Sequence, residues 1–372
     1  MRENNSDIRY QIALLEIEKV GISVARKLID HFGSAKAVFE AAKKDLLEMG
    51  SSVGHSLFNG VQDSSILSFA DAQIQFSEEQ GNYIYSYYDE DYPNRLKHCP
   101  DAPLILYVRG DADLNHTRMV AIVGTRQCTE YGRKFCEELV NELQYYGAYV
   151  VSGLAFGIDY CAHRLATDKE VPNMAVLAHG LDRIYPSEHR KLANEITVKG
   201  ALISEFPINT RPDRENFPKR NRIVAGMCDA IVVVESAYKG GSIITAKLGN
   251  DYNRDVFAIP GRLGDKQSEG CNHLIKSHQA HLLESAKDLA YILGWEKETD
   301  VPNKKPGVQK QLFLDLNAEE TVLVSTLQDG IKSIDEVMIA SGMPMSTVST
   351  QLLLLEFKGI VRQLPGKKYE LA

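Results

Sequence analysis

The chain has 372 residues, of which 44% are apolar and 25% are charged, and its formal net charge is −8. This length is too great for one average core, so we expect two or three domains of ordinary globular composition. The sequence contains no run of 18 or more apolar residues, so no membrane span is expected. The polar stretch from Met1 to Tyr10 lacks the apolar core of a signal peptide. We therefore expect a cytoplasmic protein.

The six cysteines are scattered along the chain and include no C-x-x-C pair. Zinc sites and disulfide frameworks usually show close or paired cysteine spacing, so we expect neither, and no metal ion or other cofactor. The cysteines are interpreted as packing residues in a reducing compartment. They are Cys99, Cys128, Cys136, Cys161, Cys228 and Cys271.

Residues 1–75 are predicted to form a helical domain. Apolar residues recur near the 3.6-residue period of a helix, at Leu14, Ile17, Val20, Val24, Leu28 and Phe32. Gly21 and Gly33 stand at plausible turns between them. The stretch IEKVGISVARKLIDHFGS is similar to a degenerate helix-hairpin-helix (SAM-like) unit, which often holds DNA backbone. A plain helical packing module is the alternative.

Residues 80–295 show short β-branched runs that alternate with longer amphipathic stretches. The runs are Leu104–Val108, Met119–Val123, Tyr149–Val151, Met174–Ala178, Ala201–Ile203, Ala230–Val234 and Val256–Ile259. Between them lie helical patterns such as the stretch from Gly132 to Tyr146. This alternation predicts an α/β fold, a Rossmann-like doubly wound parallel sheet with right-handed crossovers. Ligands on such sheets bind beyond the carboxyl ends of the strands.

Residues 296–311 are charged, contain two prolines and show no periodicity, so they are predicted to be a linker. The last domain, residues 312–372, has helical patterns followed by two strands around Pro365-Gly366, which is typical of a winged helix. Its expected third helix, from Met345 to Phe357, has no arginine and a single lysine at its end. Protein contact or simple packing is therefore an alternative to DNA reading.

Glycine-containing loops follow several of the expected strands. Gly124 ends a buried strand, where its missing Cβ lets backbone amides approach an anion closely. Thr125 adds a hydroxyl donor and Arg126 adds a planar charged group that suits phosphate. A tight turn with a solvated arginine is the alternative interpretation.

A second loop around Gly153 leads into a helix that carries Asp159 and His163. We expect Asp159 to cap that helix and His163 to pack, rather than to form a catalytic pair.

A third segment, from Arg211 to Arg222, carries five cations against two anions. Cations that follow phosphates and aromatic faces that stack bases are the mixture used by single-strand-binding sites. The candidate residues are Arg214, Phe217, Lys219, Arg220, Asn221 and Arg222. A solvated charged segment is the usual alternative.

A fourth loop, Gly240-Gly241-Ser242, opens a helix whose free amides can bind an anion. The sequence lacks a G-x-x-x-x-G-K-[ST] motif and a G-x-G-x-x-G motif, so neither a P-loop NTPase nor a dinucleotide enzyme is indicated. Phosphate-binding loops without bond-breaking groups predict a binding protein with no catalytic residues.

In combination these segments resemble the DNA-processing protein A (DprA, also called Smf) family. The shared motifs run in the family's order and include Tyr92-Pro93, Asp101–Pro103, Val120–Arg126, Thr129–Gly132, Ser152–Asp159, Ala162-His163, Gly180–Asp182, Tyr185-Pro186, Ser204–Phe206, Phe217–Arg222, Gly241-Ser242, Pro260-Gly261 and Gly270–Asn272. The resemblance implies a homodimer that binds single-stranded DNA on its Rossmann domain. It also implies delivery of DNA taken up in natural transformation to a RecA-type recombinase.

The same resemblance implies roles for single residues. Arg126 is expected to hold phosphate and Phe217 to stack against a base. Arg220, Asn221 and Arg222 are expected to line the same groove, and Arg214 stands where the family tends to place a cation. The amides of Gly240–Ser242 would complete the anion site.

The chain departs from the family at Gly240, which is often serine, at Ser277–Ala280, and at Phe156, which is often arginine.

Two other functions are compatible with the sequence. A Rossmann-like nucleotide-phosphate hydrolase or N-glycosidase would need a carboxylate at the pocket, for which Asp159, Asp182 and Glu235 are the candidates. A protein-interaction scaffold would use the helical and winged-helix domains instead. Neither alternative accounts for the cations and the aromatic residue in the third segment as directly as DNA binding does.

Overall fold

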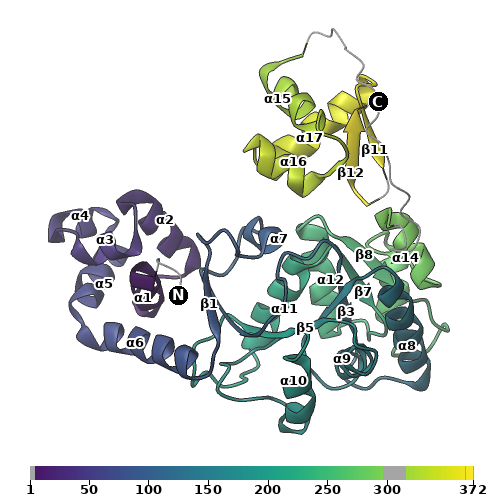
Figure 1. Cartoon of the computed structure of the whole chain (residues 1–372), viewed down its shortest axis with the longest axis horizontal. Helices are drawn as coiled ribbons and strands as arrows, with labels where there is room; N and C mark the ends of the chain where they lie inside the picture. Colours follow the sequence, from purple (N-terminus) through teal and green to yellow (C-terminus); the bar gives the residue numbers. More distant parts are fainter. Residues whose placement is uncertain (1–4, 296–315, 365, 372) are drawn as a thin grey trace.

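The computed structural model describes residues 5–295, 316–364 and 366–371, and it places helical, α/β and winged-helix parts in chain order (Figure 1). The expected linker at 296–311 and the expected start of the last domain at residue 312 lie outside the described residues. The other expected domain limits stay predictions.

Six helices form the N-terminal part. They are α1 (Asn5–Glu16), α2 (Ile22–Phe32), α3 (Ala35–Glu40), α4 (Lys43–Glu48), α5 (Ser51–Gln62) and α6 (Ser64–Glu79). Gly21 is the N-cap of α2, and Gly33 ends it in the left-handed conformation with φ +88°. The apolar face of this part is continuous with the neighbouring α/β core, because Leu14 and Leu28 belong to the same buried cluster as Leu104. Helix α6 reaches beyond residue 75, so the helical segment extends to the edge of the sheet.

The central sheet has nine strands in the order β1-β2-β6-β5-β4-β3-β7-β8-β9. From β1 to β9 their bounds are Tyr83–Ser86, Ile105–Gly110, Met119–Val123, Tyr149–Ser152, Asn173–Val176, Ala201–Ser204, Ala230–Val233, Asp255–Ala258 and His281–Leu282. All neighbours from β6 to β9 pair in parallel, whereas β2 pairs antiparallel with both β1 and β6. The doubly wound α/β fold is confirmed, with the difference that the run at Leu104–Val108 is antiparallel. The apolar composition of this run indicates that the strand is buried on both faces, but it does not indicate whether the strand runs parallel or antiparallel to its neighbours.

Helices cover both faces of the sheet (Figure 1). One face carries α8 (Glu130–Tyr145), α9 (Ile158–Asp168), α10 (Arg190–Ile196) and α14 (Ala286–Leu293). The other face carries α7 (Asn94–Lys97), α11 (Asn216–Met227), α12 (Gly241–Asp251) and α13 (Glu269–Lys276). Successive residues of β3 alternate between these two cores, since Val120 and Ile122 face α8 while Ala121 and Val123 face α11 and α12. The central strands are therefore rigid supports for the loops at their ends.

The C-terminal part is a winged helix, as predicted. It contains α15 (Ala318–Leu327), α16 (Ile334–Ser341), α17 (Met345–Phe357), β10 (Lys332–Ser333), β11 (Val361–Leu364) and β12 (Lys368–Leu371). Arg254, just before β8, forms an ion pair of 2.6 Å with Asp335 on α16. Among the described helices no single one is long and apolar enough to cross a membrane, although α16 and α17 together pass that test across a bend of 110°.

Candidate functional site

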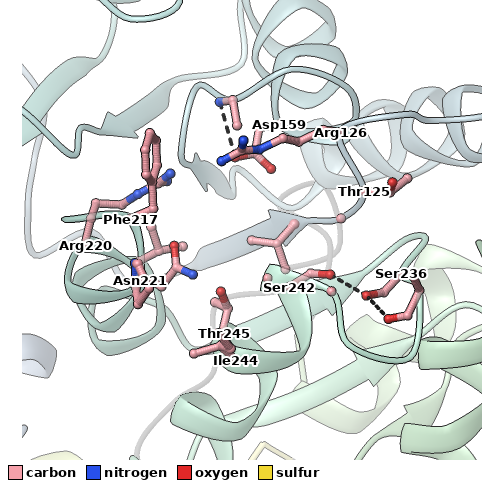
Figure 2. Close-up of a pocket in the computed structure, with 18 residues that line it drawn as sticks. Thr125, Arg126, Asp159, Phe217, Arg220, Asn221, Ser236, Ser242, Ile244 and Thr245 are labelled. Atoms are coloured by element: carbon pink, nitrogen blue, oxygen red, sulfur yellow. Dashed lines mark hydrogen bonds between the residues drawn. The ribbon is translucent and has the colours of Figure 1, made fainter. Parts of the chain in front are cut away.

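A pocket of about 260 Å³ lies at the carboxyl ends of β3 and β7 (Figure 2). These two strands are neighbours in the sheet, but the chain leaves β3 toward β4 on one side and later returns to β7 on the other. Such a switch in strand order splays the loops apart and opens a crevice, which is the usual ligand site of doubly wound sheets. The pocket therefore lies where the fold itself predicts a ligand.

The loop after β3 forms one wall of this pocket. Gly124 allows that loop to pass close to its neighbours, since a Cβ there would lie 2.5 Å from Cγ1 of Ile158 and 3.0 Å from the carbonyl oxygen of Glu235. The Thr125 amide donates to the same Glu235 oxygen at 2.7 Å, which ties the loop to β7. The loop thereby presents Arg126 at the surface, with its guanidinium 5.1 Å from the centre of the Phe217 ring. An exposed cation beside an aromatic face results.

The N-terminus of α12 forms the opposite wall. In the described part of the chain, neither the Gly241 amide nor the Ser242 amide has a hydrogen-bond acceptor. These amides and the positive end of the helix dipole face the pocket, which favours an anion there. The Ser242 hydroxyl donates to Ser236 Oγ at 2.7 Å, and a Cβ on Gly240 would lie only 2.4 Å from that oxygen. The small residues therefore keep the helix start close to the β7 loop.

Arg220 lies at the floor of the pocket and is only 4% exposed. Its guanidinium occupies space that a Cβ on Gly153 would fill, because that atom would lie 1.3 Å from Nη1. Asp159 is the nearby counter-charge: burial raises the pKa of its carboxyl and the charge of Arg220 opposes that rise. Burial lowers the pKa of Arg220 itself. Nε of Arg220 has no hydrogen-bond partner in the described structure, so the floor retains an unsatisfied donor.

The structure brings many of the predicted residues together in this pocket. Gly124, Thr125, Arg126, Phe217, Arg220, Asn221, Gly240, Gly241 and Ser242 line it. Arg214 and Lys219 are exposed but do not line it. Gly153 lines an adjoining smaller hollow.

The prediction that Arg222 lines the same groove is wrong. Arg220 and Arg222 are two positions apart on α11, and side chains at this spacing point to different sides of a helix. Arg222 is buried in an ion pair with Glu205. It also donates to the carbonyl oxygen of Asp101.

The prediction that Asp159 caps α9 is wrong, whereas His163 packs as expected. The N-cap of α9 is Gly157 and not Asp159, which lies inside the first turn and accepts from the Ala155 amide at 3.4 Å. His163 is completely buried, and its Nδ1 lies 2.8 Å from Oδ1 of Asn173. It therefore packs, as expected, away from the pocket.

Aromatic residues that sequence reasoning missed surround the smaller hollow beside Arg126 and Phe217. Tyr185 and Phe156 line it, and the Tyr185 ring lies 6.1 Å from the Phe217 ring. His189 packs against both Phe156 and Tyr160, with ring separations of 4.9 Å and 4.6 Å. Tyr185 and Phe156 were noted in the sequence but not as site residues. They come from separate segments of the chain, so no local pattern predicts that they share a hollow. They extend the aromatic surface beyond the one residue that was predicted.

Comparison with known proteins agrees with this architecture. A family model described as DNA recombination-mediator protein A matches residues 83–294, and one described as the DprA winged helix domain matches residues 311–367. Protein Smf of Synechocystis sp. is 31% identical over 98% of this chain and 99% of its own length. Protein Smf of Escherichia coli is 35% identical over 82% of this chain and 83% of its own.

Two solved structures are similar to this chain. The X-ray structure of DNA processing protein A from Streptococcus pneumoniae has a TM-score of 0.65 and 31% identity, and covers 76% of this chain and 96% of that one. A Helicobacter pylori structure, titled for the single-stranded DNA binding mode of its DNA processing protein A, has a TM-score of 0.51 and 31% identity, and covers 56% of this chain and 93% of that one. From these matches and from the order of motifs along the sheet, the chain belongs to the DNA-processing protein A (DprA/Smf) family.

Proposed function

We propose that this protein binds single-stranded DNA at the pocket between β3 and β7. The observation that carries the proposal is the pairing of Arg126 with Phe217 opposite the free amides of Gly241 and Ser242. The amides and the cation suit a phosphate, while the half-buried ring of Phe217 suits a base. A duplex keeps its bases stacked inside, so it cannot offer both groups to the same pocket. Preference for single strands follows.

We further propose that a homodimer of this cytoplasmic protein protects incoming DNA during natural transformation and loads a RecA-type recombinase onto it. Family membership supports this proposal, because the matching model is described as a recombination mediator. The Helicobacter pylori relative, whose structure is titled for single-stranded DNA binding, supports the choice of substrate. Nucleation of recombinase filaments on DNA coated with single-strand-binding protein, with and without this chain, tests the loading step.

The positions of the carboxylates support a binding role over hydrolysis. Asp159 is buried beside Arg220, and Glu235 is buried where it accepts from the Thr129 amide at 2.9 Å. Asp182 forms an ion pair of 2.7 Å with Arg183 and does not line the pocket. A general acid or base needs a carboxyl within reach of substrate, and each of these carboxyls is engaged by protein groups.

The test is fluorescence anisotropy with a labelled oligothymidylate and with a duplex, each at low and higher salt. We expect tighter binding to the single strand, with log affinity falling against log salt. Arg126→Ala should lose about tenfold or more in affinity, because a hydrogen bond to a charged group contributes about 1.5–3 kcal/mol. Its salt slope should be less steep by about 0.7.

Lys134→Ala is the matched control, because Lys134 is an exposed cation on α8 that does not line the pocket. It should keep the wild-type affinity and slope. A folded Arg126→Ala variant with full affinity contradicts the proposed site, and release of base or phosphate from the oligonucleotide contradicts the binding role.

A further inference from the structure

Two cysteines that are far apart in sequence meet beside the pocket. The Sγ atoms of Cys128 and Cys161 lie 3.9 Å apart, although the residues are 33 positions apart in the chain. Both are partly exposed, whereas the other four cysteines of the chain, Cys99, Cys136, Cys228 and Cys271, are buried. Cys128 and Cys161 also pack against the core, as predicted for all six cysteines, but their partial exposure leaves their sulfur atoms open to chemistry.

The pair joins two segments that each supply a residue to the pocket, although neither cysteine lines it. Cys128 lies on the loop after β3, two residues beyond Arg126, and Cys161 lies on α9, two residues beyond Asp159. The same two segments already touch, because the Ile158 amide donates to the carbonyl oxygen of Thr125 at 3.1 Å. A covalent bond between the cysteines would thus alter a contact on which the position of the Arg126 loop depends.

The surroundings give the two thiols different chemistry. Nε of Arg133 donates to the Cys128 sulfur at 3.5 Å, so an exposed guanidinium lies directly beside this sulfur. Burial, followed by the Cys128 sulfur, raises the pKa of Cys161 to about 11. The carboxylate of Glu235 adds to that rise, and Arg133 opposes it. Because the cation of Arg133 contacts Cys128 and burial disfavours ionisation of Cys161, we assign Cys128 as the nucleophile and Cys161 as the thiol that resolves it.

We propose that Cys128 and Cys161 form a modification site for hydroperoxides that closes into a disulfide and weakens DNA binding. The Cys128 thiolate attacks one oxygen of hydrogen peroxide, the O–O bond breaks, and hydroxide leaves and takes up a proton as water. The sulfur of Cys161 then attacks the resulting sulfenic acid, the S–O bond breaks, and the hydroxide leaves with the proton of Cys161 as a second water. Two thiols and one peroxide give one disulfide and two waters.

Closing this bond changes the pocket. A disulfide holds its sulfur atoms at about 2.05 Å, so the two sulfur atoms, now 3.9 Å apart, must approach each other. We expect this closure to shift the Arg126 loop relative to the N-terminus of α12. This consequence, but not the disulfide itself, rests on the proposed binding of single-stranded DNA. We expect the oxidised protein to bind a labelled oligothymidylate about tenfold more weakly, the loss expected for one displaced charged hydrogen bond.

The experiment uses the full chain, reduced and then treated with stoichiometric hydrogen peroxide. Peptide mass spectrometry under non-reducing conditions should find Cys128 linked to Cys161, and anisotropy before and after dithiothreitol should show weakened and then restored DNA binding. Cys161→Ser and Cys128→Ser should each bind DNA normally when reduced and lose no affinity on the same treatment.

Each outcome bears on the proposal. Peroxide treatment that leaves both thiols free, or links other cysteines first, overturns the modification site. A Cys128–Cys161 disulfide with unchanged affinity overturns its effect on binding. If the reduced wild type binds no single-stranded DNA, the proposed function fails, while the mass spectrum still decides the disulfide.

Discussion

Arg126 and Arg222 were both expected to line one groove, but they lie in different environments. Arg126 is exposed and stacked on Phe217, whereas Arg222 is buried against Glu205. A buried cation deprived of its partner is costly, and so is the carboxylate left behind. We therefore expect Arg222 to contribute to stability and Arg126 to contribute to the proposed DNA site.

Arg222→Ala should lower the free energy of unfolding by about 3–5 kcal/mol, the cost of breaking a buried ion pair. Its side chain and that of Glu205 are only 10% and 11% exposed, so solvent screening is small. Urea unfolding measures this loss, and the fraction that remains folded should keep the wild-type affinity for single-stranded DNA. A variant with undiminished stability and weakened DNA binding would show that Arg222 acts at the pocket after all. Replacing both partners, as Arg222→Met with Glu205→Gln, should recover part of the stability.

His163 makes stability depend on pH. Burial lowers the pKa of this imidazole from 6.5 to about 4, with the hydrogen bond to Asn173 partly opposing the shift. Between these two values the unfolded chain binds a proton that the folded chain does not. The free energy of unfolding is therefore unaffected by protonation of His163 above pH 6.5. It falls by up to about 3 kcal/mol as the pH drops toward 4.

Urea unfolding at several pH values compares the wild type with His163→Gln. The wild-type free energy of unfolding should fall more steeply than that of the variant between pH 6.5 and pH 4. Other buried groups with shifted pKa values, such as Asp159, titrate in both proteins and cancel in the difference. Parallel profiles would contradict this role of His163.

Among the elements, α12 is expected to contribute to DNA binding through the backbone amides of its first turn and not through any one side chain. Gly241 lies at the open side of that turn, where an added Cβ would have no atom within 4 Å. Its backbone is not in the left-handed region, so other residues fit there. A substitution at Gly241 can therefore change the proposed anion binding at the start of α12 without disrupting the helix.

Gly241→Asp should weaken binding of single-stranded DNA by about tenfold or more, because a carboxylate takes the place of the phosphate. The same carboxylate should stabilise the helix by about 0.3–1 kcal/mol through the helix dipole. Gly241→Asn has the same shape without the charge and is the control. Anisotropy and thermal melting measure both effects, and equal DNA affinity for the two variants would mean that phosphate binds elsewhere.

The strands differ in how far the sequence predicts them. Met119–Val123 has the predicted bounds, because a buried β-branched run ends at a glycine. Strands β1 and β9 were not predicted, since β1 is partly exposed and tyrosine-rich and β9 has only two residues. Edge strands bury less apolar surface than central ones, and their sequence signal is correspondingly weak.

At the scale of the whole molecule, the winged helix contacts the end of the sheet opposite to the pocket. Arg254 and Asp335 meet next to the start of β8, and Nζ of Lys367 donates to the carbonyl oxygen of Asn253 at 2.9 Å. The pocket lies at the carboxyl ends of β3 and β7. The two regions therefore lie at opposite ends of the strands.

Asp335→Ala combined with Lys367→Ala removes both of these contacts and should release the winged helix without altering the affinity for single-stranded DNA. Arg254 is 5% exposed at its side chain and keeps its hydrogen bonds to the carbonyl oxygens of Arg95 and Gly226, so the core should stay folded. Small-angle X-ray scattering should report a larger radius of gyration. Asp329→Ala, at a winged-helix acid that is 82% exposed, is the control. An unchanged radius would mean that other contacts hold the domain.

The sequence by itself determined the α/β core, the winged helix and the glycine loops that surround the pocket. These features depend on spacing within a few residues, such as the alternation in β3 and the glycine that follows it, and local spacing is what a sequence displays. Family motifs in the correct order led to the same conclusion.

Only the tertiary structure decided which charges are available to a ligand. Arg220 and Arg222 are two residues apart, yet one forms the pocket floor and the other an internal ion pair. The meeting of Cys128 with Cys161, and of Tyr185 with Phe217, likewise joins segments that are distant in the chain. Such distances are set by how helices pack on the two faces of the sheet, and no short stretch of sequence contains them.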